Sequence, residues 1–317
     1  MKITNTEHFG IQRKIVANMT SQSWHDVPHV SYTYDADAQA LYNELLKINA
    51  ERKKEERISL NVLSLKIIAE CLKEAPVMNS HITFDSKLVR GKIETFDEID
   101  ISMPMILPNG KMMTVNLKDI GNKTPDEISA YIKDIRRKAE NTNLDEAMFE
   151  VSFNDTIKGI KRGEIKKAIY RLIGSKTGKH KVKNLKGKER KAYLSIPECD
   201  RLTASDLEQG TVTVSNIGSV YKEQKGSISL LEIVPPQVCA FSVGALSEKP
   251  VVVKDDFGKP TVEARKVLPL CIAFDHRAID FGDIAPFLRK LDEILENPEI
   301  IRTYVAEQKE KATEEVA

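Results

Sequence analysis

Cysteine, tryptophan and long apolar runs are scarce in this sequence, and each shortage excludes a class of protein. The 317 residues include four cysteines and one tryptophan. No two cysteines form a Cys-x-x-Cys pair, so a zinc site or redox motif is not indicated, and reduced thiols are expected. No apolar run approaches the ~20 residues of a membrane-spanning helix, and the N-terminus lacks the apolar core of a signal peptide. We therefore expect a cytoplasmic protein that does not contact membranes.

An excess of one charge is also missing. Lys and Arg number 48 against 47 Asp and Glu, so the net charge indicates no class of partner. The sequence has no P-loop, no Gly-x-Gly-x-x-Gly, no His-Glu-x-x-His and no Gly-x-Ser-x-Gly elbow. These absences argue against nucleotide hydrolases, Rossmann dehydrogenases, zinc proteases and serine hydrolases. No metal is expected.

The length allows one large domain or two modest ones, and we expect a single α/β domain over residues 1–317. A capping box, Thr124 with Glu127, and Pro125 at the first helical position predict a helix there. Strands and helices mix without regular βαβ alternation, which predicts a sandwich of one mixed sheet covered by helices, not a Rossmann fold. The other predicted helices cover 11–22, 38–54, 61–75 and 283–296. Strands are predicted at 28–37, 210–218, 235–246 and 264–276, and two more flank a Pro-Asn-Gly turn within 99–117.

A histidine stands at the end of an apolar run in "FDHRAIDFG", residues 274–282. We expect burial of the strand to desolvate His276 partly, which keeps a neutral, basic nitrogen available to take a proton from a thiol or hydroxyl. Asp275 and Asp280 could orient the ring, or pair with Arg277 and another arginine. The same residues also fit a core histidine above an ion-paired turn, so both interpretations stay open.

A serine ends the strand-like stretch "TVTVSNIG", residues 211–218. Because Asn-x-Gly follows it, Ser215 lies where the chain turns, and its hydroxyl could donate to a developing oxyanion. A serine in this place could equally serve the turn itself.

The order of these motifs resembles the catalytic domain of the dihydrolipoamide acyltransferases of 2-oxo acid dehydrogenase complexes. The matching segments are "TVTVSNIG", "PPQVCAFSVGAL", "LPLCIAFDHRAID" and a last helix ending "LENPEI". The opening "IQRKIVANMTSQSWHDVPHVSYTYDAD" and the turn "LPNG" are also similar to that family, whose relationships extend to chloramphenicol acetyltransferase. The resemblance covers roughly residues 9–140 and 200–305, and it implies the coenzyme-A-dependent acyltransferase fold.

The resemblance also implies the chemistry. It makes His276 the general base that deprotonates an attacking thiol, and Ser215 the donor to the oxyanion. Asp280 would be chiefly architectural and pair with Arg13. The family works as trimers, with the active site between subunits, so a homotrimer is expected. Coenzyme A, as acyl-CoA, would be the co-substrate, and the acceptor would be a small molecule or a lipoylated or acidic carrier protein.

Two features depart from the family. Phe281 stands between Asp280 and Gly282, where the family has glycine directly after the aspartate. We also expect a stand-alone enzyme, since no lipoyl domain precedes the catalytic domain in this sequence. Two functions therefore remain: a stand-alone acyltransferase, and a non-catalytic trimeric scaffold or regulator of an acyltransferase core.

A basic insertion at about residues 142–198 is also foreign to the family. Residues 158–191 include fourteen Lys or Arg and two Glu. Residues 157–174 have the spacing of a basic amphipathic helix, and 175–191 the composition of a mobile loop. The insertion is interpreted as a solvated loop, a docking surface for an acidic carrier protein, or a collar for the phosphates of coenzyme A. Its aromatics, Tyr170 and Tyr193, are too few to stack nucleic acid.

Overall fold

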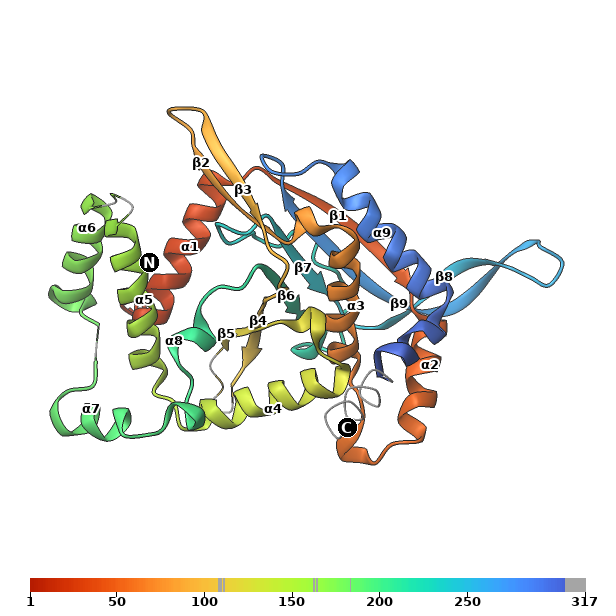
Figure 1. The fold of residues 1–317 in the computed structure, drawn as a ribbon, viewed down its shortest axis with the longest axis horizontal. Helices are drawn as coiled ribbons and strands as arrows, with labels where there is room; N and C mark the ends of the chain where they lie inside the picture. The colour runs from red at the N-terminus through yellow and green to blue at the C-terminus, as the bar shows by residue number, and fades with distance from the viewer. Residues whose placement is uncertain (108–109, 111, 162, 164, 183, 306–317) are drawn as a thin grey trace, which may run out of the picture.

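A seven-stranded mixed sheet organises the molecule (Figure 1). The computed structural model describes residues 1–107, 110, 112–161, 163, 165–182 and 184–305. The strands of the sheet are β1 (His29–Asp37), β4 (Ile101–Ile106), β5 (Met112–Leu117), β6 (Val212–Asn216), β7 (Cys239–Val243), β8 (Ser247–Lys254) and β9 (Pro260–Asp275). Their order is β1-β9-β7-β6-β4-β5, with β8 on β9. The predicted mixed sheet is confirmed: β6 runs parallel to β4 and β7, and the other pairs are antiparallel.

Helices pack around the sheet, and those outside the insertion were predicted except for the short α8. The helices outside the insertion are α1 (Ile11–Asp26), α2 (Gln39–Ala50), α3 (Leu60–Glu74), α4 (Pro125–Glu140), α8 (Ala204–Leu207) and α9 (Phe281–Glu296). The capping box at Thr124 is present, with Glu127 reaching back to the Thr124 backbone N–H. Of the predicted Pro-Asn-Gly turn, residues 108 and 109 lie outside the described residues. Gly110 has φ of +77°, a left-handed conformation that favours glycine.

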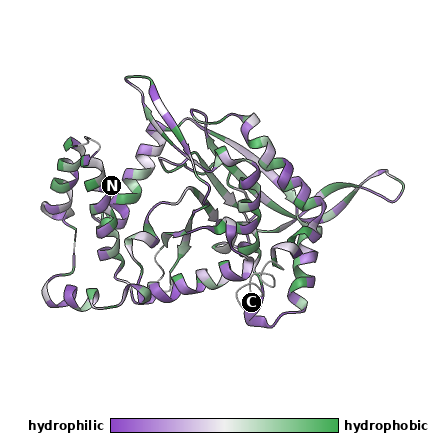
Figure 2. Ribbon diagram, viewed as in Figure 1, coloured by the Kyte–Doolittle hydropathy of each residue, from purple (hydrophilic) through white to green (hydrophobic). Residues whose placement is uncertain are grey.

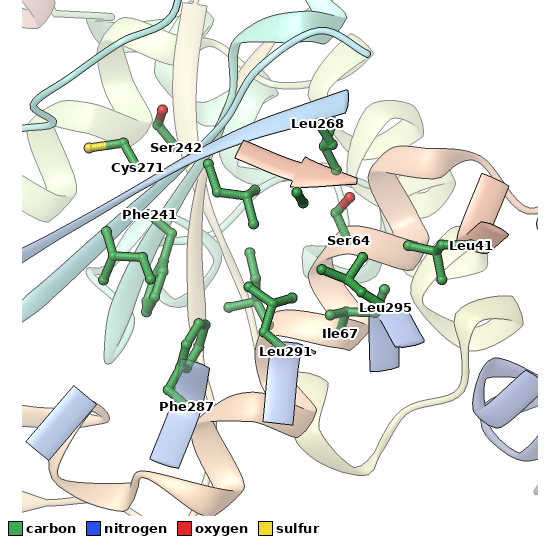
Figure 3. Close-up of a pocket in the computed structure, with 14 residues that line it drawn as sticks. Leu41, Ser64, Ile67, Phe241, Ser242, Leu268, Cys271, Phe287, Leu291 and Leu295 are labelled. Carbon is green, nitrogen blue, oxygen red and sulfur yellow. The ribbon is translucent and has the colours of Figure 1, made fainter. Parts of the chain in front are cut away.

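The core lies between the sheet and the helices α3 and α9. In Figure 3, Phe287 and Leu291 of α9 point toward Phe241 of β7 and toward the α3 side chains. The rings of Phe241 and Phe287 stack with centroids 5.2 Å apart. A small apolar cavity of about 30 Å³ remains between these layers. It is lined mostly by aliphatic side chains and belongs to the core.

The insertion contains more regular structure than predicted. It holds α5 (Leu144–Lys161), α6 (Ile165–Lys176) and α7 (Gly187–Leu194). The single helix predicted over 157–174 is wrong, because the chain leaves the helix at Gly163, where φ is +86°. The loop predicted over 175–191 is wrong in part, since α7 begins within it. Buried Glu146 of α5 accepts hydrogen bonds from Arg190 Nε (2.8 Å) and the Leu185 N–H (3.1 Å), contacts that composition does not reveal.

Two hairpins were not predicted as such. β2 (Ser80–Asp85) pairs with β3 (Arg90–Thr95) and projects from the body, where sequence analysis predicted no element (Figure 1). β8 extends β9 into a second projecting ribbon on the other side of the molecule. β3 is exposed at every position, and β8 alternates only between half-buried and exposed positions, so neither strand buries an apolar face of the kind that predicts a strand.

The four thiols are expected to differ sharply in reactivity. Burial raises the pKa of Cys71, Cys239 and Cys271, which keeps these thiols protonated and unreactive at neutral pH, whereas Cys199 is exposed. Titration of the native protein with a disulfide reagent should label one thiol rapidly and the other three only in denaturant. A Cys199→Ser variant should lose the fast phase. Rapid labelling of that variant would contradict the packing described above.

Candidate active site

His276 is mounted at the end of a strand that is held on both edges. β9 ends at Asp275, which lies opposite His29 of β1, and Phe274 lies opposite Cys239 of β7. The backbone N–H of His276 itself donates to the Pro28 carbonyl at 3.2 Å. Pairing with the neighbouring strands thus fixes the backbone position from which the imidazole projects.

Asp275 and Arg277 tie down the turn that follows. The buried Asp275 carboxylate accepts hydrogen bonds from Arg277 Nη2 (2.6 Å), Arg277 Nε (3.0 Å) and the Arg277 backbone N–H (3.0 Å). The guanidinium also lies 5.8 Å from the ring centroid of Phe84 in the β2–β3 hairpin. Of the two roles open to Asp275, the structure therefore favours the pairing with Arg277. Both residues hold the turn.

Asp280 orients the imidazole of His276. The Nδ1 atom lies 3.1 Å from Asp280 Oδ1 and 3.2 Å from the Ile279 carbonyl oxygen. Both partners accept hydrogen bonds, so Nδ1 carries the proton and Nε2 keeps a free lone pair. This tautomer makes Nε2 the basic atom. The His276 side chain is 51% exposed, so the expected desolvation is not supplied by a single chain.

The predicted pair between Asp280 and Arg13 is wrong for the single chain. Within the described residues these two side chains form no ion pair, and Arg13 is exposed near the start of α1. That end of α1 lies against other elements: Lys14 Nζ donates to the Gly174 carbonyl of α6 at 2.7 Å. The opposite end of α1, at Asp26, is followed by Pro28, whose carbonyl accepts the hydrogen bond from the His276 N–H. At a helix rise of ~1.5 Å per residue, Arg13 is roughly 20 Å from that end of the helix.

Ser215 lies at the far end of the sheet's central strands. It is the second-last residue of β6, is half-buried, and stands opposite Ser242 of β7. Gly218 fixes the turn behind it, because a β-carbon there would come within 2.6 Å of the Gly244 carbonyl oxygen. The motif Ser-Asn-x-Gly therefore has a steric reason for its glycine. The serine hydroxyl is carried on a constrained turn.

A single chain does not bring Ser215 and His276 together. Ser215 is level with Ser242, which in turn is level with Cys271 of β9. Cys271 precedes His276 by five residues, so the register places Ser215 roughly 16 Å away along the strands and two strands, roughly 10 Å, across. A proton or an oxyanion cannot be shared over that separation. A working site would therefore need Ser215 from one copy of the chain and His276 from another.

His29 is a residue near the site that sequence reasoning missed. Its Nε2 accepts a hydrogen bond from the Ile233 N–H at 3.0 Å, and its Nδ1 donates to the Val27 carbonyl at 2.8 Å. Ser23 Oγ donates to the Ile233 carbonyl at 2.7 Å. These bonds hold the segment that follows Ser215 to the start of β1, beside His276. The signal in the sequence for this role was the dipeptide Pro28–His29 at the start of the strand predicted over 28–37.

The described residues contain neither a cluster of metal ligands nor a helix that could cross a membrane. In those ranges no three His, Cys, Asp or Glu side chains gather as metal ligands. Nor does any helix there combine the length and apolar character needed to cross a bilayer.

The mixed sheet carries an oriented histidine at the end of β9 and a serine near the end of β6, two strands away, side chains that can take a proton and donate to an oxyanion. The comparison with protein families agrees. Residues 2–153 and 187–302 match the model of the 2-oxoacid dehydrogenases acyltransferase (catalytic domain). This chain belongs to that family, and residues 154–186 of the insertion lie outside the match.

Curated relatives and solved structures are similar throughout. The acetyltransferase component of the pyruvate dehydrogenase complex from Dictyostelium discoideum is 24% identical over 94% of this chain and 35% of its own length. The lipoamide acyltransferase component of the branched-chain alpha-keto acid dehydrogenase complex from Bacillus subtilis is 25% identical, over 91% and 51%. The cubic core of a pyruvate dehydrogenase complex has a TM-score of 0.63 at 20% identity, covering 95% and 94% of the two chains. The chain thus spans between a third and about half of these curated relatives, and it shares the fold of the solved core.

Asp280 provides a test of how the imidazole is oriented. Asp280→Ala removes the carboxylate acceptor, so the ring is expected to lose its tautomer and position, lowering kcat about tenfold or more with little change in KM. Asp280→Asn keeps an oxygen acceptor and should retain most of the activity. Steady-state kinetics of both variants would check this. Equal losses in the two would show that the carboxylate charge, not the orientation, is what matters.

Proposed function

We propose that this chain is a coenzyme-A-dependent acyltransferase that moves an acyl group between coenzyme A and a thiol acceptor such as dihydrolipoamide. The observation that carries the proposal is the orientation of His276, whose Nδ1–H points to Asp280 and Ile279 and leaves Nε2 as a base. Membership of an acyltransferase family supports the same chemistry. A side chain held in this tautomer on a rigid strand is prepared for proton transfer.

The proposed reaction proceeds through a tetrahedral intermediate. Nε2 of His276 takes the proton of the acceptor thiol, and the resulting sulfur nucleophile attacks the carbonyl carbon of the acyl thioester. The carbonyl oxygen becomes an oxyanion that accepts a hydrogen bond from Ser215 Oγ. The intermediate then collapses, the carbon–sulfur bond to coenzyme A breaks, and the imidazolium returns its proton to the departing thiolate. The residues of this chain thus supply one base and one donor.

The site is proposed to form between subunits of a homotrimer. The separation of Ser215 from His276 within one chain supports this, as does the half-exposed imidazole, which a neighbouring copy would cover. The similar dihydrolipoamide acetyltransferase of Azotobacter vinelandii (TM-score 0.62, 19% identity, covering 95% and 94%) has been investigated for catalytic roles of a serine, a histidine and an asparagine four residues after that histidine. Asp280 follows His276 at the same spacing.

The acceptor is proposed to be a small dithiol or the lipoyl group of a carrier protein, and the reaction to take place in the cytoplasm, where thiols stay reduced. The second candidate, a non-catalytic trimeric scaffold, is favoured by one observation. Phe281 replaces the family's glycine, is 52% exposed, and packs edge-on against Tyr32 with ring centroids 5.4 Å apart. A bulky ring therefore directly follows Asp280 in the chain.

The discriminating experiment measures release of coenzyme A from acetyl-coenzyme A with dihydrolipoamide as acceptor, in the Cys199→Ser background so that no fast protein thiol interferes. Turnover above a reaction without protein supports the enzyme. Phe281→Gly is the informative companion variant. An inactive wild type with an active Phe281→Gly variant would support the non-catalytic scaffold, because it would show that the Phe281 ring blocks an otherwise competent site.

A further inference from the structure

The helices α5 and α6 expose apolar side chains along one stripe each. On α5 the spacing is four and three residues, and on α6 it is four, three and one, so each set shares a helix face. The two helices contact one another and lie at the end of the molecule opposite α9 (Figure 1). All these side chains are between 38% and 56% exposed: Phe153, Ile157 and Ile160 on α5, with Ile165, Ile169, Leu172 and Ile173 on α6. We call this set the α5–α6 face.

The α5–α6 face is unusually apolar for a surface that is left exposed while α5 also packs on α1 and α8. An amphipathic helix normally turns its larger apolar residues inward, but α6 buries Ala168 and leaves Ile165, Ile169 and Ile173 half in solvent. Figure 2 shows hydrophobic residues recurring along both helices between hydrophilic ones. Apolar residues gathered in this way on a surface mark an interaction site more often than scattered ones do.

The α6 side of the α5–α6 face is basic, whereas α5 carries Glu150 and Asp155 near its apolar residues. Residues 165–188 include nine Lys or Arg and no Asp or Glu. Lys166, Arg171 and Lys176 are exposed on α6 itself, next to the apolar stripe. Two copies meeting through this same face would bring like charges together, which disfavours a symmetric pairing of the two faces. Carboxylates on a partner would meet these cations favourably.

We propose that the α5–α6 face binds an acidic protein whose contact surface has an apolar centre and a rim of carboxylates, as an acidic amphipathic helix does. The apolar side chains would be covered by the partner's apolar residues, and the lysines and arginines would pair with its rim. Most of the face lies in the segment outside the family match, so this binding is a property of the insertion. It does not depend on acyl transfer.

The probe is a fluorescein-labelled peptide of about 18 residues with leucines on one helical face and glutamates on the other. Its control has lysine in place of every glutamate. Fluorescence anisotropy should show binding of the glutamate peptide alone, weakening about tenfold between about 50 and about 300 mM salt. Ile169→Ser with Ile173→Ser should lower the affinity about tenfold. Lys166→Gln with Arg171→Gln should lower both the affinity and its dependence on salt.

The matched control is Leu46→Ser on α2, a side chain that is also 50% exposed and should leave binding unchanged. Circular dichroism and thermal melting establish that each variant is folded. Failure of the glutamate peptide to bind, equal binding of the two peptides, or unchanged binding by the Ile169/Ile173 variant would overturn the proposal. Binding to phosphatidylglycerol vesicles without binding to the peptide would overturn it in favour of a lipid surface. Dissociation of an oligomer by the Ile169/Ile173 substitutions would overturn it in favour of a second copy.

Discussion

Replacing His276 with alanine is expected to lower kcat for acyl transfer about 100- to 10,000-fold, the range in which a general base contributes. The reason is that Nε2, left free by the hydrogen bonds of Nδ1 to Asp280 and Ile279, is the atom proposed to remove the thiol proton. The KM for acetyl-coenzyme A should change little, because proton removal stabilises the transition state and not the bound substrate. The measurement is steady-state release of coenzyme A with dihydrolipoamide.

The fold offers a clean control for this variant. The backbone N–H of His276, not its ring, bonds to Pro28, and half of the side chain is exposed. His276→Ala should therefore keep the thermal midpoint of the wild type within a few degrees, and Arg277→Ala, which strands the buried Asp275 carboxylate, should not. Turnover by His276→Ala equal to the wild type would contradict the proposed mechanism.

Replacing Ser215 with alanine is expected to lower kcat about 100- to 1,000-fold, as removal of one oxyanion donor does. The hydroxyl is proposed to stabilise only the tetrahedral oxyanion, so KM should again stay close to the wild-type value. Ser215→Thr keeps a hydroxyl but adds a methyl group in a half-buried position, and a partial loss is expected. The kinetic assay is the one used for His276.

The same Ser215→Ala variant distinguishes a catalytic role of the hydroxyl from a structural one. A loss of thermal stability in Ser215→Ala with unchanged kcat would assign the serine to the turn, the other role that its sequence position allows. Thr213→Val, two residues earlier on the same strand, is a structural comparison. Its hydroxyl donates to Gln237 Oε1 at 2.7 Å inside the sheet, so it should affect stability and not kcat.

Local signals in the sequence predicted the elements that carry the site. Apolar periodicity gave the strand that ends before His276, and the box at Thr124 with Glu127 gave the start of α4, because both patterns are formed by neighbours in the chain. The individual strands at 28–37, 210–218 and 235–246 were predicted for the same reason. Residues near one another in sequence determine these features.

What could not be predicted depends on distant contacts. The pairing of Asp280 with Arg13 failed because a helix length separates the two ends of α1, a distance that no motif contains. The break near Gly163 and the role of Glu146 were missed, since a basic composition hides both the end of α5 and the buried carboxylate that holds the start of α7 to α5. The separation of Ser215 from His276 follows from strand order, which periodicity alone does not specify.

The most direct test of the central claim mixes the two inactive variants. His276→Ala and Ser215→Ala subunits, unfolded together and refolded as random trimers, should regain activity, because a site between copies can take its histidine from one variant and its serine from the other. With equal amounts, about a quarter of the interfaces would be intact, so about a quarter of wild-type activity is predicted. Activity no higher than that of the separately refolded variants would contradict a site shared between subunits.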